Sequence, residues 1–249
     1  MIDKTDKDWE SFGANDPYFA VLTDDKFHAT NLSEEHREDF FKSGEAHISH
    51  ILETIRKHFD KDFSPKNCLD FGCGVGRLVI PLARVSQFVT GVDVSQSMLV
   101  EAGNNCQARS INNVLLLKCD DELEVLDEEY DFIHSFIVFQ HIPFRRGEKI
   151  LQRLLSHLAC DGIGVLHFTI GVKADSLHTV STYIKSHVPF GRNIINIMRG
   201  RKINAAEMQM NAYDLHRILE ILHSFGICKF FAEFADDEPI QSIILYFKK

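Results

Sequence analysis

A glycine-rich run near residue 70 contains the residues whose types and spacing could do chemistry. Asp70 is followed by Gly72, Gly74 and Gly76, and the short apolar stretch 68–71 leads into it. Glycines let the backbone turn sharply and leave room for a ligand to come close. The apolar stretch is typical of a buried strand, and a helix after the loop would offer unpaired N–H groups at its start. The run therefore predicts a cofactor loop at the carboxyl end of a first strand.

The glycine spacing separates two kinds of cofactor. The dinucleotide fingerprint is G-x-G-x-x-G, and its third glycine would fall at Arg77. The third glycine is instead Gly76, which gives D-x-G-x-G-x-G. This run resembles motif I of the class I methyltransferases that use S-adenosylmethionine (SAM). The resemblance implies that Asp70 and the loop Gly72–Gly76 hold the methionine end of SAM. Cys73, inside this loop, could be a reactive thiol, but a small side chain beneath the cofactor is the favoured interpretation.

Another acidic residue ends the second expected strand. Asp93 follows the run 88–92, and a carboxylate at such a strand end can accept two hydrogen bonds from a ribose diol. An NAD enzyme would share this acid, and the nearby serines Ser95 and Ser97 leave open that Asp93 only caps a helix. The resemblance also assigns Val94 to the cofactor site and Met98 to the neighbourhood of the adenine.

Two more acids follow the third expected strand. The resemblance implies that an acid here faces the adenine amino group, with Asp120 as the best match, Asp121 beside it and Glu122 as a weaker candidate. The alternative is a solvated acidic loop, because the whole stretch 120–129 is acidic.

The fourth expected strand, 130–139, leads to a possible acceptor site. Its end resembles the family segment in which residues from Phe136 to His141 face the methyl-donor sulfur. His141 has an ordinary pKa that suits proton abstraction near neutral pH, so it is the candidate general base. It could equally be a packed histidine, because methyl transfer can succeed by positioning alone.

The amino-terminal segment 1–64 is expected to form a helical cap. Ser33 can cap a helix there, and the aromatic residues are reminiscent of caps in small-molecule methyltransferases. That resemblance implies that Tyr18 faces the sulfonium, which aromatic rings attract as a cation, and that Ser43 and Gly44 touch the methionine end. An ordinary aromatic core explains Tyr18 equally well.

The elements that must position these residues alternate along the chain. Alternating strands and helices predict a parallel sheet covered on both faces. The last two strands are too close together for a helical crossover, so they must be antiparallel. We therefore expect an α/β three-layer sandwich with a seven-stranded, mostly parallel sheet that ends in an antiparallel hairpin, as in class I methyltransferases, over residues 65–249. The expected strands are 67–71, 88–94, 114–119, 130–139, 163–170, 229–234 and 242–247, and the expected helices are 75–85, 145–159, 210–225 and one from Ser97.

The segment of about 171–207 has no strand pattern and carries Arg192, Arg199, Arg201 and Lys202. It is either a solvated amphipathic helix or a lid-like insertion that binds an anionic acceptor. Asn211, just after it, is either a helix cap or a border of the substrate pocket.

Composition limits the class of protein. The 249 residues carry a formal charge of −9, which disfavours nucleic acids and anionic membranes as partners. The six cysteines include no C-x-x-C pair, so no metal site is expected. The start has no apolar signal core and no run could span a bilayer, which favours a cytoplasmic protein.

These patterns favour a SAM-dependent methyltransferase acting on an oxygen or nitrogen of a small-molecule or sugar-like acceptor. Two alternatives stay open. One is a non-catalytic SAM-binding regulatory module, because no residue is obligatory for methyl transfer. The other is an NAD-type oxidoreductase, which the position of the third glycine and the terminal hairpin disfavour.

Overall fold

The computed structural model describes residues 4–172, 206, 208–237 and 240–249. Seven strands in these ranges form one sheet in the order β3-β2-β1-β4-β5-β7-β6. The strands β1 to β5 pair in parallel, whereas β7 pairs antiparallel with both β5 and β6. The expected mostly parallel sheet with a terminal antiparallel hairpin is confirmed. The strands are β1 (Asn67–Phe71), β2 (Phe88–Asp93), β3 (Val114–Lys118), β4 (Tyr130–Ser135), β5 (Leu158–Val172), β6 (Lys229–Asp237) and β7 (Ile240–Lys248).

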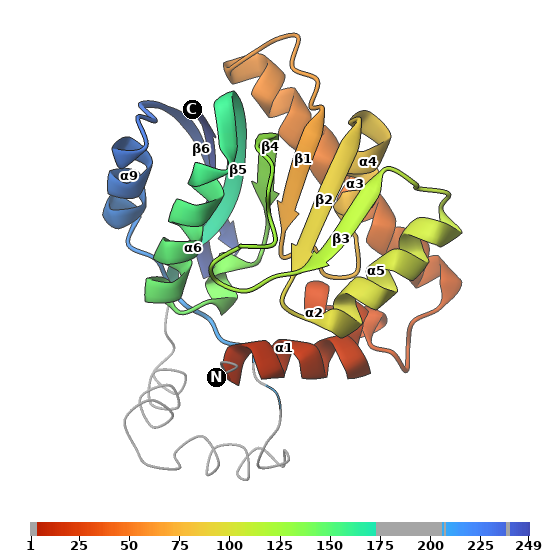
Figure 1. Ribbon diagram of the computed structural model, residues 1–249. Coiled ribbons are helices and arrows are strands. Elements are labelled where there is room, and N and C mark those ends of the chain that lie inside the picture. The colour runs from red at the N-terminus through yellow and green to blue at the C-terminus, as the bar shows by residue number, and fades with distance from the viewer. Residues whose placement is uncertain (1–3, 173–205, 207, 238–239) are drawn as a thin grey trace, which may run out of the picture.

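Helices cover both faces of the sheet, as Figure 1 shows. Three of them, α3, α4 and α5, contribute to one hydrophobic cluster, while α6 and α9 contribute to another. The short helix α1 lies at the carboxyl ends of β1, β2 and β3 (Figure 1). The helices are α1 (Lys4–Asn15), α2 (Pro17–Val21), η1 (Asp25–Phe27), α3 (Glu34–His58), α4 (Val79–Val85), α5 (Gln96–Ala108), η2 (Phe139–His141), α6 (Phe144–Ser156) and α9 (Leu215–Ser224).

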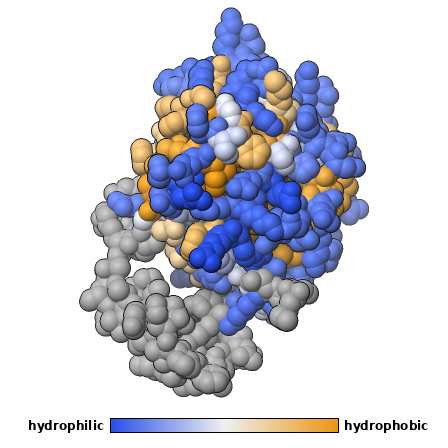
Figure 2. Space-filling view, turned by 60° about the vertical axis from the view of Figure 1, so that its left-hand side comes forward, coloured by the Kyte–Doolittle hydropathy of each residue, from blue (hydrophilic) through white to orange (hydrophobic). Residues whose placement is uncertain are grey.

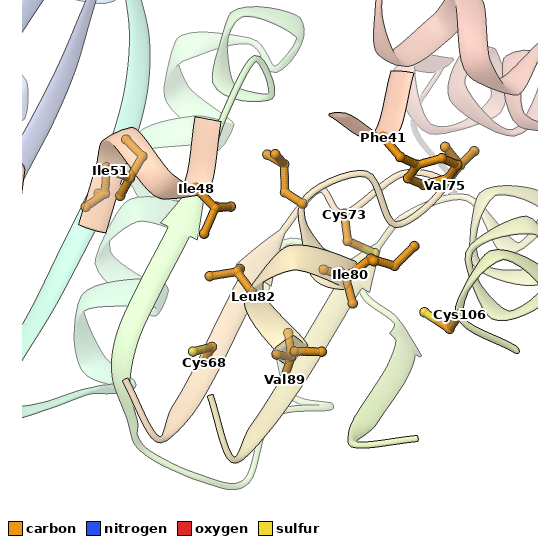
Figure 3. Packing of buried hydrophobic residues seen from close by; sticks show 14 of the residues in the cluster. Phe41, Ile48, Ile51, Cys68, Cys73, Val75, Ile80, Leu82, Val89 and Cys106 are labelled. Carbon is orange, nitrogen blue, oxygen red and sulfur yellow. The ribbon is translucent and has the colours of Figure 1, made fainter. Parts of the chain in front are cut away.

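The two hydrophobic clusters lie on opposite faces of the sheet because successive side chains of a strand point to opposite sides. In β1, Cys68 belongs to the first cluster and Leu69 to the second. In β4, Phe132 and Ile133 divide in the same way. The first cluster reaches from α3 into the glycine-rich loop, and Figure 3 shows Cys73 of that loop among its side chains. The loop is therefore anchored in the core and not free at the surface.

The amino-terminal helix α3 begins as its sequence predicts. The Ser33 side chain accepts a hydrogen bond from the backbone N–H of His36, and Glu34 and Glu35 occupy the first turn. Both features stabilise a helix start, because the hydroxyl satisfies one free N–H and the acids favour the positive end of the helix dipole.

Several element boundaries differ from those expected, and three of them bear on the site or on the residues expected to border it. β4 ends at Ser135 rather than near residue 139, since Ile137 has a φ of 61°, which breaks the extended backbone. β5 begins earlier, at Leu158. Helix α9 begins at Leu215 with Asp214 as its cap, so of the two alternatives for Asn211 the helix cap is wrong. The backbone N–H and side chain of Asn211 both donate to the Gln140 carbonyl instead.

The face of the molecule turned forward in Figure 2 is mainly hydrophilic with hydrophobic patches between. No helix in the described ranges is long and apolar enough to cross a membrane. The lid expected at 171–207 lies outside the described residues except for its ends, and so do Arg192, Arg199, Arg201 and Lys202.

Candidate functional site

A cavity opens where the carboxyl ends of the parallel strands meet helix α1. The space between its walls, including the open mouth, is about 960 Å³. Residues from the glycine loop, from the ends of β1, β2 and β3, and from the segment after β4 line this space. The candidates from the sequence that line it are Asp70, Gly72, Cys73, Gly74, Asp93, Val94, Met98, Asp120, Asp121, Phe136 and His141. Tyr18, Ser43, Gly44 and Gly76 are not among its lining residues.

The glycine loop needs its glycines for two different reasons. Gly72, Gly74 and Gly76 all have positive φ values, of 73°, 52° and 85°, which residues with a side chain rarely adopt. A Cβ on Gly72 would also meet Val138 at 2.4 Å, and one on Gly74 would meet Val21 at 2.8 Å. At Gly76 the nearest atom would be 3.5 Å away, so there the backbone conformation alone requires glycine.

The N–H groups of this loop are used inside the protein. Gly72 and Cys73 donate to the Val92 carbonyl, and Gly76 donates to the Cys73 carbonyl. Gly74 donates to Asp93 Oδ2 at 2.9 Å. The next helix, α4, begins only at Val79, so the expected start of this helix at about residue 75 is wrong. Free N–H groups are what a bound pyrophosphate requires.

Asp93 closes β2 and faces the cavity. Its Oδ2 accepts from Gly74 N–H and its Oδ1 from Ser95 N–H, each at 2.9 Å. A carboxylate has about four acceptor positions, so each oxygen can still accept an O–H. Ser95, not Asp93, caps helix α5, by accepting from Met98 N–H. Burial raises the pKa of Asp93 to about 6, although its backbone hydrogen bonds oppose this rise.

Asp120 and Asp121 follow β3 and have different partners. Asp120 Oδ1 accepts from the backbone N–H groups of Glu122 and Leu123. Both oxygens of Asp121 accept from Arg146 at 2.7 Å. Arg146 also donates to Asp6 of α1 at 2.9 Å, and these three residues all line the cavity. Of the two candidates, Asp120 is therefore the one whose second oxygen is not engaged by this arginine.

His141 lies at the wall of the cavity behind Trp9. Its Nδ1 is 2.7 Å from the Gln209 carbonyl, which fixes Nδ1 as the donor. Its Nε2 is 3.2 Å from Gln140 Nε2, and the Trp9 ring lies 4.9 Å away between centroids. Burial lowers the pKa of His141 to about 4. The imidazole is therefore neutral at pH 7 and a weak base.

The cap residues expected near the methionine end do not line the cavity, and of these Tyr18 and Gly44 are buried whereas Ser43 is exposed. The Tyr18 hydroxyl is 2.6 Å from Glu101 Oε1 and 2.9 Å from Asn105 Oδ1. Ser43 Oγ donates to the Phe40 carbonyl. Gly44 packs on the backbone of Arg77, whose carbonyl oxygen would lie 2.3 Å from an added Cβ. From this segment the cavity is reached by Ala20 and Val21 of α2 and by Thr5, Asp6 and Trp9 of α1.

Sequence reasoning did not identify two buried residues beside the glycine loop. Arg77 lines the cavity and is only 5% exposed. His134 of β4 is fully buried and its Nδ1 lies 2.9 Å from Asp70 Oδ1. The position of Arg77 directly after the last glycine was the available signal for the first residue. The second had none, because its register opposite Asp70 comes from the pairing of β1 with β4.

Comparison with known proteins finds similarity to methyltransferases. Residues 68–162 match the family model described as a methyltransferase domain. Ubiquinone biosynthesis O-methyltransferase of Rickettsia akari (strain Hartford) is 27% identical over 119 residues, 48% of this chain and 46% of the relative. The same enzyme of Hydrogenovibrio crunogenus is 31% identical over 106 residues, 41% of this chain and 44% of the relative. The chain thus spans about half the length of these curated relatives.

Solved structures share the fold over nearly the whole chain. Magnesium protoporphyrin IX methyltransferase (ChlM) from Synechocystis PCC 6803, solved with bound S-adenosylhomocysteine (SAH), matches with a TM-score of 0.65 at 19% identity, covering 99% of this chain and 100% of that one. N-methyltransferase NodS from Bradyrhizobium japonicum WM9, also with SAH, matches with a TM-score of 0.58 at 15% identity, covering 99% of each chain. At these identities the likeness concerns the fold.

Proposed function

We propose that the chain is a class I SAM-dependent methyltransferase, whose cavity binds SAM and transfers the methyl group to an oxygen or nitrogen of a small molecule. The observation that carries this proposal is the placement of acids at three neighbouring strand ends. Asp70 lies near the end of β1, Asp93 is the last residue of β2 and Asp120 comes just after β3, and all three line one cavity beside the glycine loop. Their order along the sheet matches the order of methionine, ribose and adenine in SAM.

Each part of the cofactor would have its own partners. The sulfonium and ammonium of SAM are positive, which suits a wall carrying Asp70. Asp93 would accept from the ribose hydroxyls through the free positions on its two oxygens. Asp120 would accept from the adenine amino group, with Val94 and Met98 beside the ring. The cofactor supplies the reactive methyl group, while the protein supplies orientation and electrostatics.

The methyl acceptor would enter over Phe136, Ile137 and His141, between the segment after β4 and helix α1. With a pKa near 4, His141 is poorly suited to deprotonate an acceptor. Its hydrogen bonds to Gln209 and Gln140 instead suit it to fix this wall of the cavity. Methyl transfer would then depend on aligning sulfur, methyl and nucleophile in a site that excludes water.

Charge and enclosure support a small acceptor rather than RNA. The similar proteins include an RNA methyltransferase, 23S rRNA (uracil(1939)-C(5))-methyltransferase RlmD of Burkholderia cenocepacia, which this chain matches over 98 residues, or 21% of that protein. A net charge of −9 repels a polyanion. Residues 1–64, proposed as a cap on the SAM-binding domain 65–249, place α1 across the cavity and narrow the approach.

Two observations disfavour a dinucleotide cofactor. The loop N–H groups of Gly72, Cys73, Gly74 and Gly76 already have acceptors, so they cannot bind a pyrophosphate without rearrangement. The buried carboxyl group of Asp70 and the partly exposed one of Asp93 would also face its negative charges.

Thermal melts with SAM, SAH and NAD in separate samples test the cofactor. A ligand at about 100 times its Kd adds roughly 2.7 kcal/mol, which raises Tm by about 5–10 °C for a chain of this size. We expect a rise with SAM and SAH and none with NAD, whereas a rise with NAD alone contradicts the proposal. Formation of SAH with a panel of phenols, hydroxy compounds, amines and RNA then tests transfer. Binding of SAM with no turnover for any acceptor would favour a regulatory module.

A further inference from the structure

Strand β6 is one edge of the sheet. It pairs with β7 on one side, and among the described residues no strand lies on its other side (Figure 1). All nine of its residues pair with β7 in a regular register without a bulge. Every second residue of an edge strand turns its N–H and C=O away from the sheet, where they can pair with another strand. A long and regular edge of this kind suits the addition of a strand.

The side chains of β6 make this edge apolar. Phe230 is 49% exposed and Phe234 is 72% exposed, the highest value for a large hydrophobic side chain in the described part of the chain. Because they are four residues apart, both lie on the same face of the strand. Edges are often protected by proline, a bulge or several lysines, but the stretch 229–235 has a single lysine and no proline. The edge therefore favours contact with another strand.

The sequence of β6 is complementary to itself in one antiparallel register. A two-fold axis that crosses the sheet at Phe231 places Lys229 of each copy opposite Glu233 of the other. Two pairs of opposite charge then form, and such cross-strand pairs are stabilising. On the other face of the strand, the same axis places Phe230 opposite Ala232, so a large side chain meets a small one. Charge and size therefore favour the same register.

Neighbouring registers are less favourable. An axis one residue away, at Phe230 or at Ala232, leaves Lys229 and Glu233 opposite uncharged residues. An axis at Glu233 brings Lys229 opposite position 237 but also sets the two Glu233 carboxylates opposite each other. Like charges in that position are destabilising. The axis at Phe231 is therefore the one that the sequence of the strand supports.

Both charged side chains are available at the edge. Lys229 is exposed, and its Nζ lies 5.2 Å from the centre of the Phe59 ring. The carboxylate of Glu233 is 2.6 Å from the Tyr246 hydroxyl and 3.0 Å from His50 Nε2, and its side chain is 27% exposed. A carboxylate has about four acceptor positions, so Glu233 can also accept from a lysine. Its existing bonds hold it in place before a second copy binds.

We propose that β6 pairs antiparallel with β6 of a second copy of this chain, in the register centred on Phe231. The pairing joins two seven-stranded sheets into one continuous sheet. The cavity is lined from the strand ends of β1 to β4, whereas β7 and β5 lie between β6 and β4. Each copy therefore keeps its own cavity open to ligands, and the inference does not depend on the proposed function.

Two charge variants test the register. In a homodimer, Lys229→Glu places two carboxylates opposite each other at both pairs, and Glu233→Lys does the same with two ammonium groups. We expect each variant alone to raise the dissociation constant of the dimer about tenfold or more. A mixture of the two variants restores opposite charges at both pairs, so it should dimerise far more tightly than either variant alone. Sedimentation velocity over a series of protein concentrations measures these constants.

A disulfide tests the same register by distance. The axis at Phe231 places Cys228, directly before β6, opposite position 234. Opposed residues of an antiparallel pair are about 4.5–5.5 Å apart between Cα atoms, a distance that a disulfide spans. In a Cys160→Ser background, we expect Phe234→Cys to form a cross-linked dimer with diamide as the oxidant. Phe144→Cys, at an exposed position on α6, is the control and should stay monomeric on a non-reducing gel.

The outcomes are distinct. If wild type sediments as a monomer at every concentration, the inference is wrong and something other than a second copy covers the edge. If wild type is a dimer that neither charge variant weakens, the copies meet at another surface. If the mixture stays as weak as the single variants, or Phe234→Cys does not cross-link, the register centred on Phe231 is wrong. Circular dichroism and Tm verify that each variant is folded.

Discussion

Nδ1 of His134 lies 2.9 Å from Oδ1 of Asp70, and the two residues are paired across the parallel strands β4 and β1. Both side chains are almost fully buried, at 1% and 3% exposed. His134 Nε2 in turn lies 3.1 Å from His47 Nε2 of α3. The acid of the glycine run is therefore linked through one imidazole to the helix that packs behind the loop.

We expect His134→Phe to destabilise the fold by about 3 kcal/mol, because it leaves the Asp70 carboxyl group buried without its partner. Urea unfolding monitored by circular dichroism measures the change. His216→Phe is the control, since that side chain is 78% exposed on α9, and it should change stability by less than about 0.5 kcal/mol. Equal stability of His134→Phe and wild type would mean that the pair contributes nothing to the fold.

The pKa of Asp93 predicts how cofactor affinity depends on pH. Burial, with a contribution from the Asp70 charge, raises this pKa to about 6 in the free protein. Ribose hydroxyls donate best to the ionised form, so affinity is highest above pH 6 and falls as Asp93 becomes protonated. We expect SAH to bind about tenfold more weakly at pH 5 than at pH 7. Calorimetry at several pH values measures this.

The matched variant for that experiment is Asp93→Asn. It cannot titrate and offers fewer acceptor positions, so SAH should bind weakly with little change between pH 5 and pH 7. If the variant keeps the pH dependence of wild type, another group is responsible for it and the ribose assignment loses its support.

Local sequence patterns were sufficient to predict the acidic residues at the strand ends. Asp70, Asp93 and Asp120 each follow an apolar run, and the carboxyl ends of parallel strands converge on one edge of a sheet. The glycines could be predicted from equally local information, because their positive φ values depend on the turn itself. These features require no knowledge of which distant segments meet, so the sequence alone predicted that they line a common cavity.

Distant contacts explain what the sequence could not predict. For Tyr18 the sequence left open a position facing the sulfonium or a place in an aromatic core. The structure places it in the core, with its hydroxyl beside Glu101 and Asn105, more than 80 residues away. The boundary of α9 was misplaced because Asn211 binds Gln140 instead of capping the helix. Arg77 became visible as a candidate only once its burial and its contact with Ser43 were known.

From the ion pairs of Arg146 we predict that helix α1 acts as a cover over the cavity. Arg146 joins Asp121, at the end of β3, to Asp6 of α1. Because these side chains are about one-fifth to one-third exposed, the contact with Asp6 contributes only modestly to stability. We expect Asp6→Ala to speed SAH dissociation about threefold. This factor corresponds to a loss of less than 1 kcal/mol in the interaction that holds α1 over the cavity.

Trp9 provides the signal for that measurement. It is the only tryptophan of the chain and lines the cavity on α1, so its fluorescence should change when SAH leaves in a stopped-flow dilution. Asp39→Ala is the control, because Asp39 forms a surface pair with Lys26 at 3.5 Å and should leave the rate unchanged. A rate for Asp6→Ala equal to that of wild type would contradict the role of Asp6 in closing the cover.

From the environment of His167 we predict that the folded protein loses stability in acid. This residue of β5 is 5% exposed, its Nδ1 has no hydrogen-bond partner among the residues that the structure describes, and burial lowers its pKa to about 4. The unfolded chain, with an ordinary histidine pKa near 6.5, binds a proton between pH 6.5 and 4 that the folded chain does not. Stability from this residue is therefore complete above pH 6.5 and is lost progressively as the pH falls toward 4.

We expect His167→Gln to reduce the loss of stability between pH 6.5 and pH 5 by about 2 kcal/mol relative to wild type, because the variant has no proton to bind at this position. Urea unfolding at both pH values gives the difference directly, independent of the constant effect that the substitution has on packing. His216→Gln, at the exposed site on α9, should show the same acid response as wild type. If His167→Gln also loses stability as steeply as wild type, His167 is protonated in the folded protein and the unpaired Nδ1 has a partner in solution.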